Sequence, residues 1–246
     1  MKFPLRSTVQ IGRYVASQKG KDRYPLVIML EPTLGCNIAC IGCGKIREYE
    51  SNKARLTVEE CLHAAVECPA PVISVCGGEP LIFKGIEEVV AGFLDMKRNV
   101  QLCTNALRLV DMLPKFSPDP RLTFVIHLDG MKEIHDYICD YPGLWEIAVD
   151  AIRAARDNGF RVTTNTTIFK ETEVSDVIGP YVGRDGDLAL AAWAEPSAGG
   201  RSLLAARIDA KGVLRGSFNA RGVFSGTIRP STLAPRQRWP RSLCSA

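Results

Sequence analysis

Short apolar runs alternate with longer amphipathic stretches from residue 26 to about residue 177. The apolar runs have the length and composition of buried strands, and the stretches between them repeat apolar positions with the period of a helix. Strands that alternate with helices predict an α/β fold with a parallel sheet, closed into a barrel or partial barrel. The predicted strands cover residues 26–30, 71–80, 99–105, 122–130 and 160–169, and the predicted helices cover residues 57–68, 85–98, 108–115 and 143–159.

Polar and sulfur-bearing residues follow each predicted strand. In a barrel of this kind the functional residues lie at the carboxyl ends of the strands. We therefore expect these segments to meet at one edge of the sheet. They are a cysteine loop after the first strand, the turn Gly77–Pro80 after the second, Cys103, Thr104 and Asn105 at the third, Asp129 and Gly130 at the fourth, and Asn165 near the fifth.

The character of the sequence changes after about residue 178. Residues 179–246 contain nine Arg and one Lys but four acidic residues, and amphipathic helices are hard to find there. The run at 188–194 is the strongest candidate for a sixth strand. Three interpretations stay open for this tail: a divergent end of the barrel, a partly disordered basic extension, and a change of reading frame in the coding sequence. We expect three parts, namely an N-terminal amphipathic segment at 1–24, the barrel at 25–178 and an atypical basic tail at 179–246.

The composition allows one large domain or two small ones. The chain has 246 residues, 46% of them hydrophobic, and its net charge of +4 is too weak to indicate a nucleic-acid partner. The N-terminal residues are polar and basic, unlike a signal peptide, and no apolar run has the length of a transmembrane helix. Nine cysteines in such a chain favour metal ligands over disulfides and a cytoplasmic location.

The segment at 1–24 is basic and amphipathic. Val9, Ile11, Tyr14 and Val15 alternate with arginines and lysines. Such a segment can lie on a membrane surface, although a short helix packed on the domain is the more common case. Peripheral contact with the inner face of the membrane is a hypothesis at this stage.

Cys36, Cys40 and Cys43 have the spacing C-x3-C-x2-C. Three thiolates on one short loop can hold three corners of an iron–sulfur cubane and leave the fourth iron open. The alternative is a binding module built on a zinc knuckle with a distant fourth ligand. The turn Gly77-Gly78-Glu79-Pro80 favours the cluster, because glycines let a backbone approach a ligand closely and Glu79 can accept hydrogen bonds from an ammonium group. Taken alone, that motif also fits an ordinary strand-to-helix turn.

Together the two motifs resemble those of the radical S-adenosylmethionine superfamily, over about residues 25–170. The resemblance implies a partial (β/α)6 barrel and one [4Fe–4S] cluster held by the three cysteines. It implies S-adenosylmethionine on the open iron, its methionyl ammonium held by Glu79 and the adjacent backbone. Reduction of the cluster would cleave the sulfonium and release a 5′-deoxyadenosyl radical. An electron donor such as ferredoxin or flavodoxin is implied as a partner.

Five longer segments of the sequence resemble one particular family within this superfamily. CIGCGKI, SVCGGEPL, LCTNAL, HLDGMKEIHD and TTNTTIFKET resemble the adenosylhopane synthases of bacterial hopanoid biosynthesis. Gly42 stands before the third cysteine, where the superfamily usually has an aromatic residue. In the adenosylhopane synthases the radical adds to the alkene of diploptene, which implies a hopene as the lipid substrate here. The resemblance stops at about Asp176.

Radical addition to an alkene leaves a carbon radical that needs a hydrogen atom. Cys103 ends a predicted strand and lies outside the cluster triad. Because a thiol S–H bond is weak, we predict that Cys103 faces the substrate and quenches this radical. A small buried hydrophobic role is an equal alternative.

The remaining polar candidates have two readings each. Asn105, Asp129 and Asn165 can hold the ribose hydroxyls or the carboxylate of the cofactor, or they can cap loops. His127 and His135 have no metal-ligand spacing, and we interpret them as structural histidines.

Overall fold

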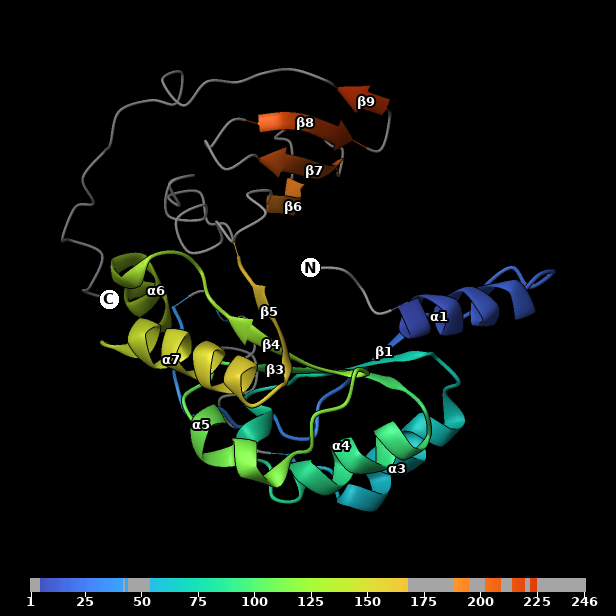
Figure 1. Cartoon of the computed structure of the whole chain (residues 1–246), viewed down its shortest axis with the longest axis horizontal. Coiled ribbons are helices and arrows are strands. Elements are labelled where there is room, and N and C mark those ends of the chain that lie inside the picture. The colour runs from blue at the N-terminus through green and yellow to red at the C-terminus, as the bar shows by residue number, and fades with distance from the viewer. Residues whose placement is uncertain are drawn as a thin grey trace. The chain divides into compact units, whose positions relative to one another are not determined.

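Five parallel strands form one sheet. The computed structural model describes residues 5–41, 43 and 54–167 with their side chains, and the backbone of four further strands between residues 188 and 224. The sheet has the order β1-β2-β3-β4-β5 (Figure 1), and each neighbouring pair is parallel. This order confirms the predicted α/β fold. The strands are β1 (Val27–Leu30), β2 (Val72–Val75), β3 (Asn99–Thr104), β4 (Leu122–His127) and β5 (Arg161–Asn165).

The core lies between the sheet and the helices. Along β3, Leu102 is buried whereas its neighbour Cys103 is half-buried, as the alternation of side chains along a strand requires. Leu102 pairs in register with Phe124 of β4. The ring of Phe124 packs edge-on against Phe116 and Phe160. The opposite face of the sheet carries Cys103, and it is the face that is available to line a functional site.

The predicted helices connect the strands. They are α3 (Val58–Glu67), α4 (Ile86–Asp95), α5 (Leu109–Met112) followed by η2 (Leu113–Lys115), and α7 (Leu144–Asp157). The capping box of α3 is present: Glu60 N donates to Thr57 Oγ1 at 3.1 Å, and Thr57 N donates to Glu60 Oε2 at 2.6 Å. Gly159 follows α7 with a φ of +80°, the left-handed conformation expected after a helix.

Two further helices lie among the described residues of this part of the chain. α1 (Leu5–Ser17) forms from the N-terminal amphipathic segment, and Gln10 ties it to the sheet by donating to Lys97 O and accepting from Asn99 Nδ2. α6 (Lys132–Cys139) was not predicted, because the predicted strand extended to residue 130 and no side chain caps the helix. Among the described helices, none is long and apolar enough to cross a membrane.

The tail contains a separate antiparallel sheet. The chain divides into two compact units, residues 1–169 and 170–246. In the second unit the strand order is β6-β7-β8-β9. The run at 188–194 is a strand, as predicted, and it pairs antiparallel with β7 of this second sheet. These strands are β6 (Leu188–Ala194), β7 (Ser202–Ile208), β8 (Leu214–Asn219) and β9 (Gly222–Phe224).

The Gly-Gly turn after β2 is hydrogen-bonded to the segment that leads into the cysteine loop. Gly78 N donates to Thr33 O at 3.0 Å, and Glu79 N donates to Gly35 O at 2.9 Å. A Cβ on Gly78 would lie 1.9 Å from Gly35 O, and one on Gly77, whose φ is +112°, would lie 2.5 Å from Thr33 O. Both glycines are therefore needed because two backbones touch.

A buried carboxylate ties this turn to the end of β3. Glu79 is 1% exposed, at the start of η1 (Pro80–Ile82). Its Oε1 accepts from Leu81 N at 2.9 Å and from Thr104 Oγ1 at 2.8 Å, and its Oε2 accepts from Asn105 N at 2.8 Å. Burial raises the pKa of Glu79, and these hydrogen bonds oppose the rise.

Replacing Gly78 by Ala should separate the turn from the cysteine loop. The new methyl group would overlap a backbone oxygen that has no rotamer to change, so we expect a loss of at least about 2 kcal/mol of unfolding free energy in urea. Gly12→Ala is the control, since nothing lies within 4 Å of its Cβ position in α1. That variant should gain up to about 1 kcal/mol. Equal stability of the two variants would contradict the close backbone contact between Gly78 and Gly35.

Replacing Glu79 by Gln should lower the free energy of unfolding by an amount that depends on pH. The amide nitrogen cannot accept from Asn105 N, which costs about 2 kcal/mol when the wild-type carboxyl is protonated. Because the folded-state pKa of Glu79 is raised above 4.5, its stabilising contribution is complete below that pH and declines as the pH rises through the folded value.

The difference in unfolding free energy between wild type and Glu79→Gln should therefore shrink as the pH rises above 4.5. Urea titrations at several pH values measure this difference. Glu88→Gln, at an exposed position of α4, should show no such slope. A deficit that grows with pH would mean that Glu79 is stabilised as a carboxylate.

Candidate functional site

One cavity of about 270 Å³ opens at the carboxyl ends of the strands. It brings together residues from the cysteine loop, the Gly-Gly turn and the ends of β3, β4 and β5. Pro80 is the exception among the expected residues: it is buried at the first position of η1 and fixes the turn. The expected residues in the wall are Cys36, Cys40, Cys43, Gly77, Gly78, Glu79, Cys103, Asn105, Asp129 and Asn165.

The cysteine loop is held from three sides. Leu34 N donates to Ala54 O at 3.2 Å, on the way into the loop, and Cys43 N donates to Cys40 O at 3.1 Å, which closes a turn. Ile41 N donates to Ile138 O of α6 at 2.8 Å. Gly42, which precedes Cys43 in the sequence, lies outside the described residues, so the family resemblance drawn from it stays a prediction. These bonds fix three half-buried thiols on one side of the cavity.

Asn105 links the cysteine loop to β3. Its Nδ2 donates to Asn37 Oδ1 at 2.8 Å, and its Oδ1 accepts from Leu107 N at 3.0 Å. Since Asn105 N already bonds Glu79, the loop, the turn and the strand end form one network. Asn105 lines the cavity and caps this loop at the same time. Contact of its side chain with a cofactor stays a prediction.

Asp129 plays the corresponding part between β4 and β5. It is fully buried, and its Oδ1 accepts from Thr167 N at 2.8 Å. Its Oδ2 lies 2.7 Å from Nε2 of His127, which also lines the cavity. Burial lowers the pKa of His127, but the hydrogen bond and the charge of Asp129 outweigh it and raise the pKa above its ordinary value. Sequence reasoning treated His127 as structural, although the H-x-D spacing on a strand already places both side chains on one face.

Cys139 is a thiol whose position sequence reasoning missed. It is fully buried in α6, in a small hydrophobic cluster against which Cys36 and Cys40 pack. Its Sγ lies 3.8 Å from His135 Nδ1, which accepts from Asp129 N at 3.1 Å. Burial lowers the pKa of His135 to about 4, so this ring is neutral, as a structural histidine should be.

The ligand atoms of His127, Asp129 and Cys139 lie within 4.8 Å of one another. The ion pair between His127 and Asp129 accounts for most of this grouping.

Cys103, the last residue but one of β3, lines the same cavity as the cysteine loop. Its Sγ is 3.7 Å from Ser74 Oγ. Burial raises the pKa of the Cys103 thiol. Cys76, at the end of β2, lines the same cavity, whereas Cys61 of α3 is fully buried away from it. The wall therefore offers two cysteines besides the three of the loop.

The donor set fits an iron–sulfur cluster with an open position. Three thiols project from one loop into one cavity, and they are soft ligands. Contact with the Cys139 thiol lowers the pKa of Cys40, which favours the thiolate that binds metal. The rest of the wall combines the polar side chains of Glu79, Asn105, Asp129 and Asn165 with the apolar side chains of Ile38, Val125 and Ile138, which suits an organic ligand with polar and apolar parts.

Comparison with known proteins identifies the family. The family model of the radical SAM superfamily matches residues 30–178. The AdoMet-dependent heme synthase of Methanosarcina barkeri is 28% identical over 151 residues, covering 59% of this chain and 43% of that protein. The PqqA peptide cyclase of Bradyrhizobium diazoefficiens is 24% identical over 170 residues, covering 66% and 45%. The chain spans less than half the length of these relatives.

Solved structures show the same fold. Streptococcus suis SuiB bound to S-adenosylmethionine superposes with a TM-score of 0.52 at 16% identity, over 72% of this chain and 41% of that one. TYW1 with a lysine-pyruvate adduct superposes with a TM-score of 0.53 at 13% identity, over 79% of this chain and 82% of that one. The chain belongs to the radical SAM superfamily, whose cofactors are a [4Fe–4S] cluster and S-adenosylmethionine, as the two motifs led us to expect.

Proposed function

We propose that the protein adds a 5′-deoxyadenosyl radical to the alkene of diploptene and forms adenosylhopane. The observation that carries this proposal is the Cys103 thiol, which shares a cavity with the three cysteines of the loop. A thiol at this place can donate a hydrogen atom to the carbon radical that remains after the addition. The resemblance of the strings around residues 40–46, 74–81 and 102–107 to adenosylhopane synthases supports the choice of substrate.

When bound, the reduced cluster and S-adenosylmethionine supply the adenosyl radical. Cys36, Cys40 and Cys43 would hold the cluster. Carbonyl groups of the turn at 77–79 would receive the methionyl ammonium, because the Glu79 carboxylate already accepts three hydrogen bonds from the chain. Asn105 and Asn165 would hold the polar groups of the nucleoside.

Cys103 completes the reaction. Formation of the C–C bond consumes the alkene π bond and leaves one unpaired electron on the adduct. The S–H bond of Cys103 breaks and its hydrogen atom moves to that carbon, which leaves a thiyl radical. One electron from the donor, such as ferredoxin or flavodoxin, and one proton restore the thiol. Burial raises the pKa of Cys103 and keeps it in the S–H form that this step needs.

A membrane-soluble hydrocarbon also suits a protein that contacts the membrane. We propose that α1 provides this contact at the inner face, since arginines and exposed apolar residues share the helix.

A second candidate is a radical SAM enzyme with a more polar substrate. One row across the sheet pairs Ser74 with Gln101, Gln101 with Thr123, and Thr123 with Arg161, all half-buried and on the face that carries Cys103. Burying such groups against a hydrocarbon leaves them without partners, which is unfavourable. Incubation of the reduced enzyme with diploptene, followed by mass analysis, separates the two candidates.

Each loop cysteine should be required for the cluster. Anaerobic reconstitution of wild type should give a brown protein that cleaves S-adenosylmethionine when reduced. Cys36→Ala, Cys40→Ala and Cys43→Ala should each lose both the cluster absorbance and cleavage. Cys61→Ala, which removes a buried thiol of α3, should retain both. A colourless wild type with stoichiometric zinc would exclude this chemistry.

Replacing Cys103 by Ala should uncouple cleavage from product. We expect S-adenosylmethionine cleavage at about the wild-type rate, because Cys103 is outside the loop, with loss of the saturated adduct. In deuterated water the wild-type adduct should gain one deuterium, since the thiol proton exchanges with solvent. Cys76→Ala, in the same wall, is the matched control and should retain the adduct. Unchanged adduct yield from Cys103→Ala would end the assigned role.

A further inference from the structure

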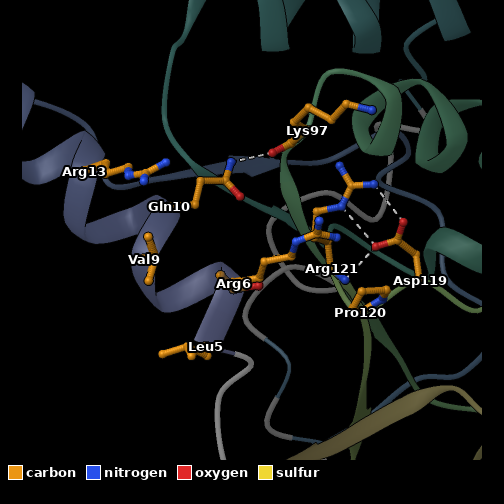
Figure 2. Close-up of a pocket in the computed structure, with 10 residues that line it drawn as sticks. Leu5, Arg6, Val9, Gln10, Arg13, Lys97, Asp119, Pro120 and Arg121 are labelled. Atoms are coloured by element: carbon orange, nitrogen blue, oxygen red, sulfur yellow. Dashed lines mark hydrogen bonds and ion pairs between the residues drawn. The ribbon is translucent and has the colours of Figure 1, made fainter.

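A second, larger cavity lies at the opposite edge of the sheet. It measures about 850 Å³, between α1 and the segments that lead into β3 and β4 (Figure 2). Lys97 stands two residues before β3, and Asp119, Pro120 and Arg121 come directly before β4. These are the amino ends of the strands, whereas the cysteine cavity lies at the carboxyl ends. A ligand bound here would leave the cysteine cavity open.

The wall of this cavity has an excess of positive charge. Arg6 and Arg13 come from α1, and Lys97 and Arg121 come from the loops. Among the described residues of the wall, Asp119 is the one carboxylate, and it is paired with Arg121: Arg121 Nε donates to Oδ1 at 3.0 Å and Nη2 donates to Oδ2 at 2.7 Å.

Arg121 is held further by Nη1, which donates to Leu94 O at 2.7 Å. Arg6, Arg13 and Lys97 form no ion pair with a carboxylate within the described part of the chain. Like charges around one hollow repel one another, and an anion between them removes that repulsion. Planar guanidinium groups match the oxygens of a phosphate group in particular.

Apolar residues border the same hollow. Leu5 is 78% exposed and Val9 is 42% exposed, both on α1 and both in the wall. Figure 2 shows Leu5, Val9 and Arg13 along α1, with Arg6 among the basic groups near Arg121. A ligand that uses both sets of residues carries a phosphate and a hydrocarbon part.

We propose that this cavity binds the phosphate headgroup of an anionic membrane lipid. Arg6 and Arg13 bind the phosphate oxygens, and Leu5 and Val9 contact the glycerol and acyl region. The exposed apolar side chains of α1 lie beside the arginines, as in helices that lie in a membrane interface. This inference deepens the membrane contact proposed above and rests on it, but it does not depend on the substrate.

Co-sedimentation of the full chain with vesicles tests the site. Wild type should bind vesicles of phosphatidylcholine with phosphatidylglycerol and should not bind phosphatidylcholine alone. Arg6→Gln/Arg13→Gln should reduce partitioning about 30-fold, because each cation near an anionic surface contributes about 1 kcal/mol. Lys84→Gln/Arg156→Gln removes the same charge from exposed positions outside the cavity and should reduce it far less. Leu5→Ser/Val9→Ser should weaken binding with all charges intact.

Each other outcome overturns a defined part of the proposal. Equal losses in the two charge variants would mean attraction by net charge and would remove the site while the membrane contact survives. Absence of vesicle binding by wild type would remove the contact itself. If glycerol phosphate raises the thermal midpoint of wild type but not of Arg6→Gln/Arg13→Gln, and vesicles do not bind, the site takes a free phosphate ester and the lipid assignment is wrong. S-adenosylmethionine cleavage should be unchanged in both charge variants.

Discussion

The buried carboxylate of Glu79 is the contact on which the geometry of the site depends. Three donors reach it from two segments, and it is 1% exposed, so each donor would lose its partner if the carboxylate moved. Because Asn105 bonds both Glu79 and Asn37, a shift of the turn would also shift the cysteine loop. The ends of two parallel strands and one loop are thereby fixed by a single side chain. The loop that carries Cys36, Cys40 and Cys43 is therefore positioned in part by this polar network.

Asp129 repeats the arrangement two strands away. It too is buried, and it accepts a backbone N–H from the segment after the neighbouring strand. His127 compensates its charge at 2.7 Å, whereas the hydrogen bonds that Glu79 accepts among the described residues come from neutral groups, and the charge of Arg108 acts on it without an ion pair. The cavity therefore has one side with a compensated carboxylate and one side that favours positive charge. A cofactor with an ammonium and a sulfonium group is attracted to the second side.

The sheet and the helices that connect its strands were predictable because local patterns determine them. Strand alternation and the capping box at Thr57 depend on neighbours in sequence, and both are present. The Gly-Gly turn was predicted correctly but for another reason, since its glycines make room for Thr33 and Gly35. That contact joins segments about 40 residues apart, and no local pattern encodes it. Cys139 was missed for the same reason: its closeness to Cys40 depends on α6, whose start has no capping side chain.

The carboxyl ends and the amino ends of the strands carry different functional groups, and this difference bears on function. The carboxyl ends of the strands hold buried carboxylates and thiols, whereas the amino ends hold Lys97 and Arg121, near the part of α1 that carries Arg6 and Arg13. In barrels the amino ends of the strands usually serve stability. Arg121 is paired with Asp119, but Arg6 and Arg13 form no ion pair within the described residues, and cations grouped around one cavity repel one another. Their persistence at this edge is explained by an anionic partner, and a partner at the edge away from the cysteine cavity can hold the protein in place without blocking catalysis.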